Sequence, residues 1–117
     1  MTFNVEVLLK GKRDVVVEVV RHDVIDPKKL TDDDVREVLR LTLLEFDRVN
    51  NPEAQQRQVS LLGLSWIVTP LDKGVAIAIE IASGAVVAGP FEVEADDLTQ
   101  SVQRVLASQS TRREQVH

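Results

Sequence analysis

The stretch VAIAIEI, residues 75–81, decides the fold. Its large apolar residues fall at every second position, a period typical of a β-strand, and small residues or a glutamate occupy the positions between them. Turn sequences lie on both sides, over residues 70–74 and 83–84. Further strands are predicted over residues 59–68 and 85–88. Because such short connections join antiparallel neighbours, the three strands predict a meander.

The N-terminal segment predicts two more strands. Apolar and polar residues alternate from Phe3 to Leu9, and valines alternate at positions 15, 17 and 19. The stretch between them, Lys10-Gly11-Lys12-Arg13, is turn-like. This pattern predicts a β-hairpin.

Two helices are predicted from their caps and their apolar spacing. Thr31 is a favourable N-cap, and Asp34 completes an approximate capping box. Apolar residues then recur at helical spacing for about 18 residues, until Asn50-Asn51-Pro52 supplies a stop signal. A second helix is predicted to begin within residues 95–97. Its apolar stripe consists of Leu98, Val102, Val105 and Leu106.

The resulting order, ββαβββα, indicates an α+β fold with a five-stranded, mostly antiparallel sheet and two helices. In element order alone, with no shared motif, it resembles the longin, roadblock and profilin-like group. That resemblance implies an antiparallel sheet with helices on its faces and carries no function. We expect a single domain over residues 1–107 and a flexible C-terminal tail over residues 108–117.

Composition excludes several classes of function. A net charge of −5 over 117 residues opposes binding to phosphate backbones, so no nucleic-acid partner is expected. The absence of cysteine excludes disulfides, thiolate nucleophiles and cysteine-based metal sites. The N-terminus does not have the pattern of a signal peptide, and no apolar run is long enough to span a membrane. We therefore expect a cytoplasmic protein without a membrane partner.

No stretch carries a recognisable catalytic, cofactor-binding or metal-binding motif. Residues 63–66, Gly-Leu-Ser-Trp, lack the second glycine of a nucleophile elbow. Gly84 and Gly89 are not followed by the lysine of a phosphate-binding loop. His22 lies beside Asp23, but adjacent side chains on a strand point to opposite faces. We expect no cofactor and no bound metal.

The back of the meander is a candidate interface. One face of these strands carries large apolar side chains, as a core requires, whereas the other is small and largely uncharged where a solvated face would be polar. We expect this second face to be covered, either by the second helix or by a partner subunit, a partner protein or a ligand. The matching side of the first hairpin is expected to be polar, with Asn4, Glu6, Lys10, Asp14 and Glu18. The candidate interface residues on the meander are Gly63, Ser65, Ile67, Ala76 and Ala78.

The first helix offers a second candidate interface. At helical spacing Leu44 falls among charged residues, and Leu41 widens the apolar face beyond the usual stripe. Contact with a helix of another chain through these two residues is a further expectation. Glu45 falls on the apolar side of the same helix.

These features favour a non-catalytic, self-associating protein-interaction domain, expected to be a homodimer. One alternative is a small-ligand-binding protein or minor enzyme with a pocket between the sheet and the first helix, where Glu45 or Glu80 would be a partly buried carboxylate. Another is an acidic inhibitor or decoy that binds a basic protein through Asp32 to Asp34. The sequence identifies neither the ligand nor the pathway.

Overall fold

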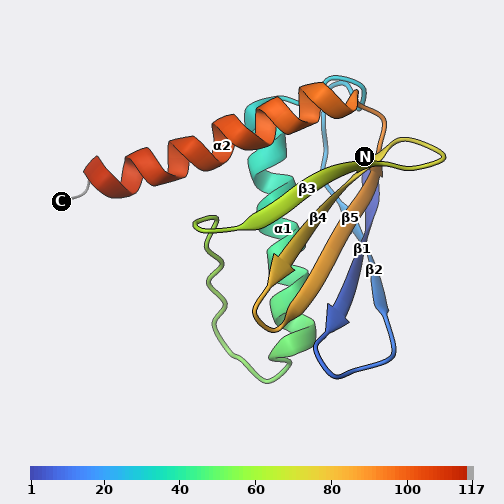
Figure 1. Cartoon of the computed structure of the whole chain (residues 1–117), viewed down its shortest axis with the longest axis vertical. Helices are drawn as coiled ribbons and strands as arrows, with labels where there is room; N and C mark the ends of the chain where they lie inside the picture. Colours follow the sequence, from blue (N-terminus) through green and yellow to red (C-terminus); the bar gives the residue numbers. More distant parts are fainter. Residues whose placement is uncertain (116–117) are drawn as a thin grey trace.

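The computed structural model describes the backbone of residues 1–115 and the side chains of residues 1–109. Its sheet contains five strands, all antiparallel to their neighbours, in the order β2-β1-β5-β4-β3. The predicted α+β class and ββαβββα order are confirmed (Figure 1). The elements are β1 (Thr2–Leu9), β2 (Val16–Arg21), α1 (Asp32–Asn50), β3 (Ser65–Pro70), β4 (Val75–Ile81), β5 (Gly84–Phe91) and α2 (Ala95–Gln115).

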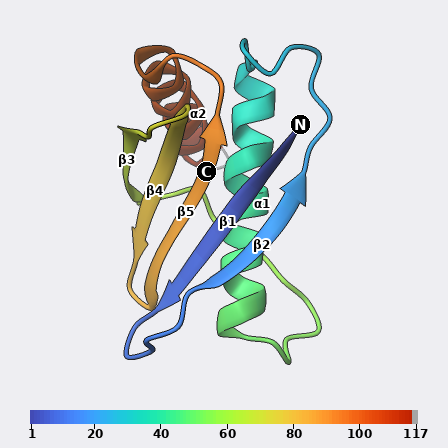
Figure 2. The same ribbon diagram turned by 90° about the vertical axis from the view of Figure 1, so that its right-hand side faces the viewer.

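One hydrophobic core lies between one face of the sheet and the two helices. Figure 2 shows the strands in front of α1, which runs behind them. Phe3 of β1 packs on Phe91 of β5, with ring centroids 5.2 Å apart. Alternate residues of the strands and the apolar stripes of both helices complete this core, which includes Val5, Val7, Val38, Leu39, Phe46, Ile77, Ile79, Val86, Val102 and Val105. Their burial is the main favourable term in folding, at roughly 25 cal/mol per Å² of apolar surface.

The start of α1 is fixed by the predicted capping box. The Thr31 side chain accepts a hydrogen bond from the Asp34 backbone N–H, and the Asp34 carboxylate accepts one from the Thr31 N–H, each 3.1 Å long. These bonds satisfy two donors that a helix N-terminus otherwise leaves unpaired. Further along the helix, the buried Thr42 hydroxyl donates to the Val38 carbonyl, so no polar group is stranded there.

A polar contact joins the start of α1 to α2. Asp32 accepts a hydrogen bond of 2.6 Å from the Ser101 hydroxyl and two bonds of 2.9 Å from the Arg104 guanidinium. Below these bonds the apolar stripe of α2 enters the core, as Leu98, Val102 and Val105 are buried. The second helix is therefore held on the same side of the sheet as α1.

Strand β3 begins later than predicted. Residues 59–64 are not in a strand, and Gly63 has a positive φ of +66°. Arg57 holds the preceding loop by donating to the Asp47 carboxylate and to the Asn51 carbonyl. Apolar residues in this loop pack against the core without strand geometry, which explains why their pattern resembled a strand; they are Val59, Leu61 and Leu64.

Strand β5 and helix α2 are both longer than their sequence patterns. β5 continues through Gly89-Pro90 to Phe91, although this dipeptide is typical of a turn. α2 runs past Leu106 to Gln115. The flexible tail expected over residues 108–117 stays a prediction, and residues 116–117 lie outside the described part of the chain. Within residues 1–115, neither helix is long and apolar enough to cross a membrane.

Gly84 provides a test of the contact between β5 and β1. Its φ is +153°, and a Cβ at this position would overlap the backbone carbonyl of Leu8. Gly84→Ala should therefore lower the free energy of unfolding by at least about 2 kcal/mol, measured by chemical denaturation. Gly63→Ala is the matched control, because φ is positive there but no atom lies within 4 Å of the added methyl. It should cost about 1 kcal/mol, and equal losses in the two variants would contradict this account.

Candidate functional site

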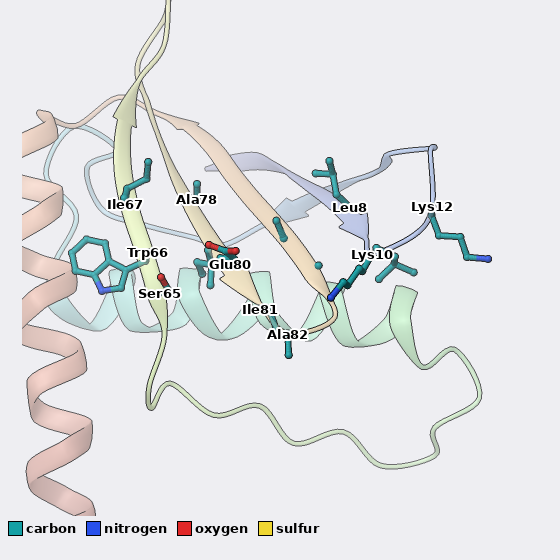
Figure 3. A pocket seen from close by; sticks show the side chains of 14 residues that line it. Leu8, Lys10, Lys12, Ser65, Trp66, Ile67, Ala78, Glu80, Ile81 and Ala82 are labelled. Carbon is teal, nitrogen blue, oxygen red and sulfur yellow. The ribbon is translucent and has the colours of Figure 1, made fainter.

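Within residues 1–115, no helix lies over the face of the sheet opposite the core. Figure 3 views this face: α1 lies behind the strands and α2 lies beside β3. Packing agrees with the picture, since both helices contribute buried residues to the same core. Of the coverings expected from the sequence, the second helix is excluded for this face. We call this surface, on the side of the sheet away from the two helices, the outer face.

The outer face is lined by alternate residues of all five strands. The pairing registers place these side chains on one side of the sheet. Apolar side chains are exposed near both edges: Val19 is 71% exposed, Val17 52%, Ile67 62% and Leu8 41%. The members of the outer face are Thr2, Asn4, Glu6, Leu8, Val17, Val19, Arg21, Ser65, Ile67, Thr69, Ala76, Ala78, Glu80, Ala85, Val87 and Gly89.

A shallow hollow lies across the β3 half of the outer face. Its volume is about 750 Å³, and Ile67, Ala78 and Ala85 contribute to its lining. Small side chains in the middle strands leave this space between the larger ones at the sides. Lys10 and Lys12 stand at one end of the hollow, and Glu80 rises from its floor (Figure 3). The hollow therefore offers an apolar surface with charges of both signs around it.

The candidate interface residues of the meander do not all lie together. Ser65, Ile67 and Ala78 share the outer face, as the register of β3 with β4 requires. Gly63 lies in the loop before β3, because the strand begins two residues later than it. Ala76 has no exposed surface at all, so it adds no area to an interface. It lies where the β4–β5 register shifts, between Val75 and Ile77.

The candidate interface on α1 is less open than its sequence pattern predicts. Leu41 is half-buried and packs against the core, which takes up the extra width of the apolar face. Leu44 is also half-buried. Neither leucine provides the freely exposed apolar surface that Ile67 or Val19 provides, so we favour the outer face.

The two candidate carboxylates are in different environments. Glu80 is exposed on the outer face. Glu45 has a side chain only 15% exposed and forms an ion pair with Arg48 one turn further along α1. A hollow of about 240 Å³ does lie between the end of α1 and the sheet, but neither glutamate lines it. The structure does not bring the two carboxylates into one pocket.

The histidine and the aspartates near it are divided between separate contacts. His22 Nε2 lies 3.0 Å from the Asp34 carboxylate, whereas Asp23 pairs with Arg21. Asp26 accepts a hydrogen bond from the Lys28 backbone. Among the described residues, no group of three or more His, Asp or Glu side chains could hold a metal ion.

The acidic run at the start of α1 is largely engaged within the chain. Hydrogen bonds from Arg104, and then from Ser101, lower the pKa of Asp32 to about 2. Burial alone would raise the pKa of Asp34, but hydrogen bonds from Thr31 and His22 outweigh it, and the pKa is lowered. Asp33, the remaining member, forms an ion pair with Arg36. Asp32 and Asp34 are therefore engaged within the chain, whereas the side chain of Asp33 is 91% exposed.

The sequence missed the β2 end of the outer face. The first hairpin was expected to be polar there, with Glu18 and Asn4 on the same side. In the observed register, however, Val19 lies opposite Asn4 and Val17 lies opposite Glu6, whereas Glu18 lies opposite Val5 and faces the core side. A shift of one residue exchanges the two faces of a strand, so the register was the missing information. The sequence did contain a signal for apolar residues on this face, because valines occupy both odd and even positions of residues 15–20 and so fall on both faces of the strand.

Asp32 gives the structure a defined acid sensitivity. Its pKa is about 2 in the folded chain and 3.8 in the unfolded reference, so its contribution to stability is fully present above about pH 4 and is lost as the pH falls towards 2. Because the side chain is 42% exposed, solvent screening limits this contribution to about 1 kcal/mol or less. Asp32→Asn should lower the stability at pH 7 by that amount and flatten its acid dependence between about pH 4 and 2, measured by denaturation at a series of pH values.

Asp72→Asn is the control for this prediction, since Asp72 is exposed in the turn before β4. It removes the same charge and should leave both the stability at pH 7 and the acid dependence nearly unchanged. An acid dependence of Asp32→Asn identical to that of the parent would contradict the assigned role of Asp32.

Comparison with known proteins does not add to this description. No family model, no curated protein and no solved structure matched the chain.

Proposed function

We propose that this protein is a non-catalytic, self-associating protein-interaction domain, and that the outer face of its sheet is the interaction surface. The observation that supports this most directly is the absence of any covering element over the outer face of the described chain, together with the exposure of Val17, Val19 and Ile67 on it. An antiparallel sheet that meets water on one side is usually polar on that side. Here the polar residues are interrupted by apolar ones on every strand.

The middle of the outer face supports a packing role. Ala78, Ala85 and Val87 lie side by side on adjacent strands and are half-buried by their neighbours. Their small size keeps the surface flat enough for another apolar surface to approach closely. Ile67, at the β3 side, projects beyond them (Figure 3) and would bury the most area on contact. Its complete burial would be worth about 1.5–3 kcal/mol before the costs of association.

The two alternatives have weaker support. A ligand pocket between the sheet and α1 would need Glu45 or Glu80 inside it, but Glu80 is exposed and Glu45 pairs with Arg48. An acidic decoy would need free carboxylates at the start of α1, but Asp32 is held by Ser101 and Arg104. An apolar contact surface requires neither a buried glutamate nor free carboxylates at the start of α1.

Ile67→Asp tests the proposal. It places a charge in the exposed apolar surface, so it should weaken self-association at least tenfold, which corresponds to about 1.4 kcal/mol. The measurement is the molar mass by light scattering over a dilution series. Ile25→Asp is the matched control, because Ile25 is fully exposed in the loop before α1, away from the outer face, and the substitution removes the same side chain and adds the same charge.

The parent should self-associate, Ile25→Asp should match it, and Ile67→Asp should give smaller assemblies. A parent that is monomeric at every concentration, or equal assembly of the two variants, would refute the proposed use of the outer face. The cytoplasmic location expected from the sequence stays a prediction.

A further inference from the structure

Strand β2 forms an unprotected edge of the sheet. It is the terminal strand in the order β2-β1-β5-β4-β3, and Figure 2 shows no strand or helix beyond it. Its exposed residues are mostly valines: Val16 and Val17 are 37% and 52% exposed and Val19 is 71% exposed. An edge strand of this kind presents free backbone donors and acceptors to any other strand that approaches.

The hydrogen bonds of the hairpin show which backbone groups are free. The His22 N–H donates to the Met1 carbonyl, which makes this a hydrogen-bonded pair of the β1–β2 ladder. Because such pairs alternate along an antiparallel ladder, Val20 and Glu18 also direct their backbone groups towards β1. Val17, Val19 and Arg21 therefore direct their N–H and C=O groups away from the sheet. The residues with free backbone groups are also those whose side chains lie on the outer face.

Glu18 is a charged residue on the core side of β2, but other protective features of edge strands are missing from this strand. Residues 16–21 include no lysine and no proline, and they pair with β1 in unbroken register. The opposite edge differs, because β3 ends at Pro70, which has no N–H, and α2 packs beside it. Of the two edges, β2 is the one open to another strand.

We infer that β2 pairs antiparallel with β2 of a second copy of this chain, so that the two sheets join into one continuous sheet. This inference rests on the self-association in the proposed function and specifies one of its contacts. A two-fold axis makes each β2 both donor and acceptor for the other, so each copy satisfies the free backbone groups of Val17, Val19 and Arg21 in its partner.

Registers centred on residues 17 to 21 all match the free backbone groups, and charge separates them. The register centred on Arg21 places Arg21 opposite Arg21, and the one centred on Val20 places Arg21 opposite Val19, which is paired with Asn4 and brings no unlike charge near. Pairing centred on Glu18 would place Glu18 opposite Glu18 of the second copy, and pairing centred on Val17 would place Arg21 opposite Arg13. Like charges directly opposite each other destabilise a ladder. Pairing centred on Val19 avoids all of these like-charge pairs, because Val19 then lies opposite Val19 of the second copy and Arg21 lies opposite Val17.

The register centred on Val19 also brings unlike charges together. Arg21 of one copy lies opposite Val17 of the other, and Val17 is paired in its own sheet with Glu6. All three side chains are on the outer face, so the Arg21 guanidinium can reach across Val17 to the Glu6 carboxylate of the second copy. Within one chain Arg21 forms an exposed ion pair with Asp23 and lies opposite Thr2, about 13 Å along β1 from Glu6. An attraction between Arg21 and Glu6 can therefore act only between the copies, where it would replace the exposed pair with Asp23.

Single cysteines test this register, because the chain has no cysteine of its own. In the inferred pairing the two Val19 Cα atoms are about 5.5 Å apart, within the range of a disulfide, whereas the two Val17 Cα atoms are about 13 Å apart or more. Under mild oxidation Val19→Cys should convert to a disulfide-linked dimer, and Val17→Cys should stay largely unlinked. Both positions are exposed, so both variants should fold. Efficient cross-linking of Val17→Cys, or equal yields from the two, would overturn the inferred register.

Backbone and charge variants test the pairing without a cross-link. Val19→Pro removes an N–H that β1 does not use, so the chain should keep its far-UV spectrum but lose the edge contact, and Val19→Thr, which keeps the N–H, should retain it. Arg21→Glu should weaken the contact, and adding Glu6→Arg should restore it. Failure of the double variant to recover would contradict the Arg21–Glu6 attraction, and full assembly of a folded Val19→Pro would overturn the pairing.

The edge contact and the outer-face contact can fail separately. If the edge inference is right, Val19→Cys should still cross-link when Ile67→Asp is also present. Selective loss of assembly in Ile67→Asp, with no cross-linking of Val19→Cys in any background, would retain the proposed function and overturn the edge contact. A strictly monomeric parent would overturn both.

Discussion

Burial of the apolar stripe of α2, which includes Leu98, Val102 and Val105, holds the second helix on the core side of the sheet. Phe91 ends β5, and α2 begins at Ala95, so the connection between them is short. With so few linking residues the helix has to pack near the end of β5. Its apolar stripe joins the core that the sheet forms with α1, and the bonds from Ser101 and Arg104 to Asp32 add a polar contact between the two helices. The other side of the sheet receives no element from residues 1–115.

This one-sided arrangement explains the residue types on both faces. On the core face β4 carries Val75, Ile77 and Ile79, which fill the space under the helices. On the outer face the same strand carries Ala76, Ala78 and Glu80, which are too small or too polar to form a core of their own. The outer face is therefore partly apolar without forming a second core. In the proposed function, such a surface would bind and release a partner without unfolding of the chain.

The sequence predicted the parts of the fold that depend on local patterns. The capping box at Thr31 and the alternation in residues 75–81 each specify one element, and both are as predicted. The predicted start of β3, at residue 59, was wrong because apolar residues of the preceding loop pack against the core as strand residues do. The valines of β2 were assigned to the wrong faces because register depends on which residue of β1 lies opposite, a property of two strands together.

The candidate site shows the same division between local and long-range information. Ile67 and Ala78 were found because their strands alternate clearly and join through a short turn. Gly63 was included because the predicted strand was too long. Leu44 was expected to be exposed from its helical position alone, which takes no account of neighbouring segments. The face of the sheet that α2 covers could not be derived, because an apolar stripe of Leu98, Val102 and Val105 would suit either face.

The two proposed contacts use perpendicular directions of the same sheet. Backbone hydrogen bonds lie in the plane of a sheet, whereas side chains stand perpendicular to it. Pairing at β2 therefore consumes the free N–H and C=O groups of Val17 and Val19 and leaves Ile67, on the opposite margin, uncovered. It also places the outer faces of two copies side by side, with their valines adjacent across the axis. A joined surface of that kind presents more continuous apolar area to a partner than either copy alone, so edge pairing would strengthen the outer face as a binding surface and would not compete with it.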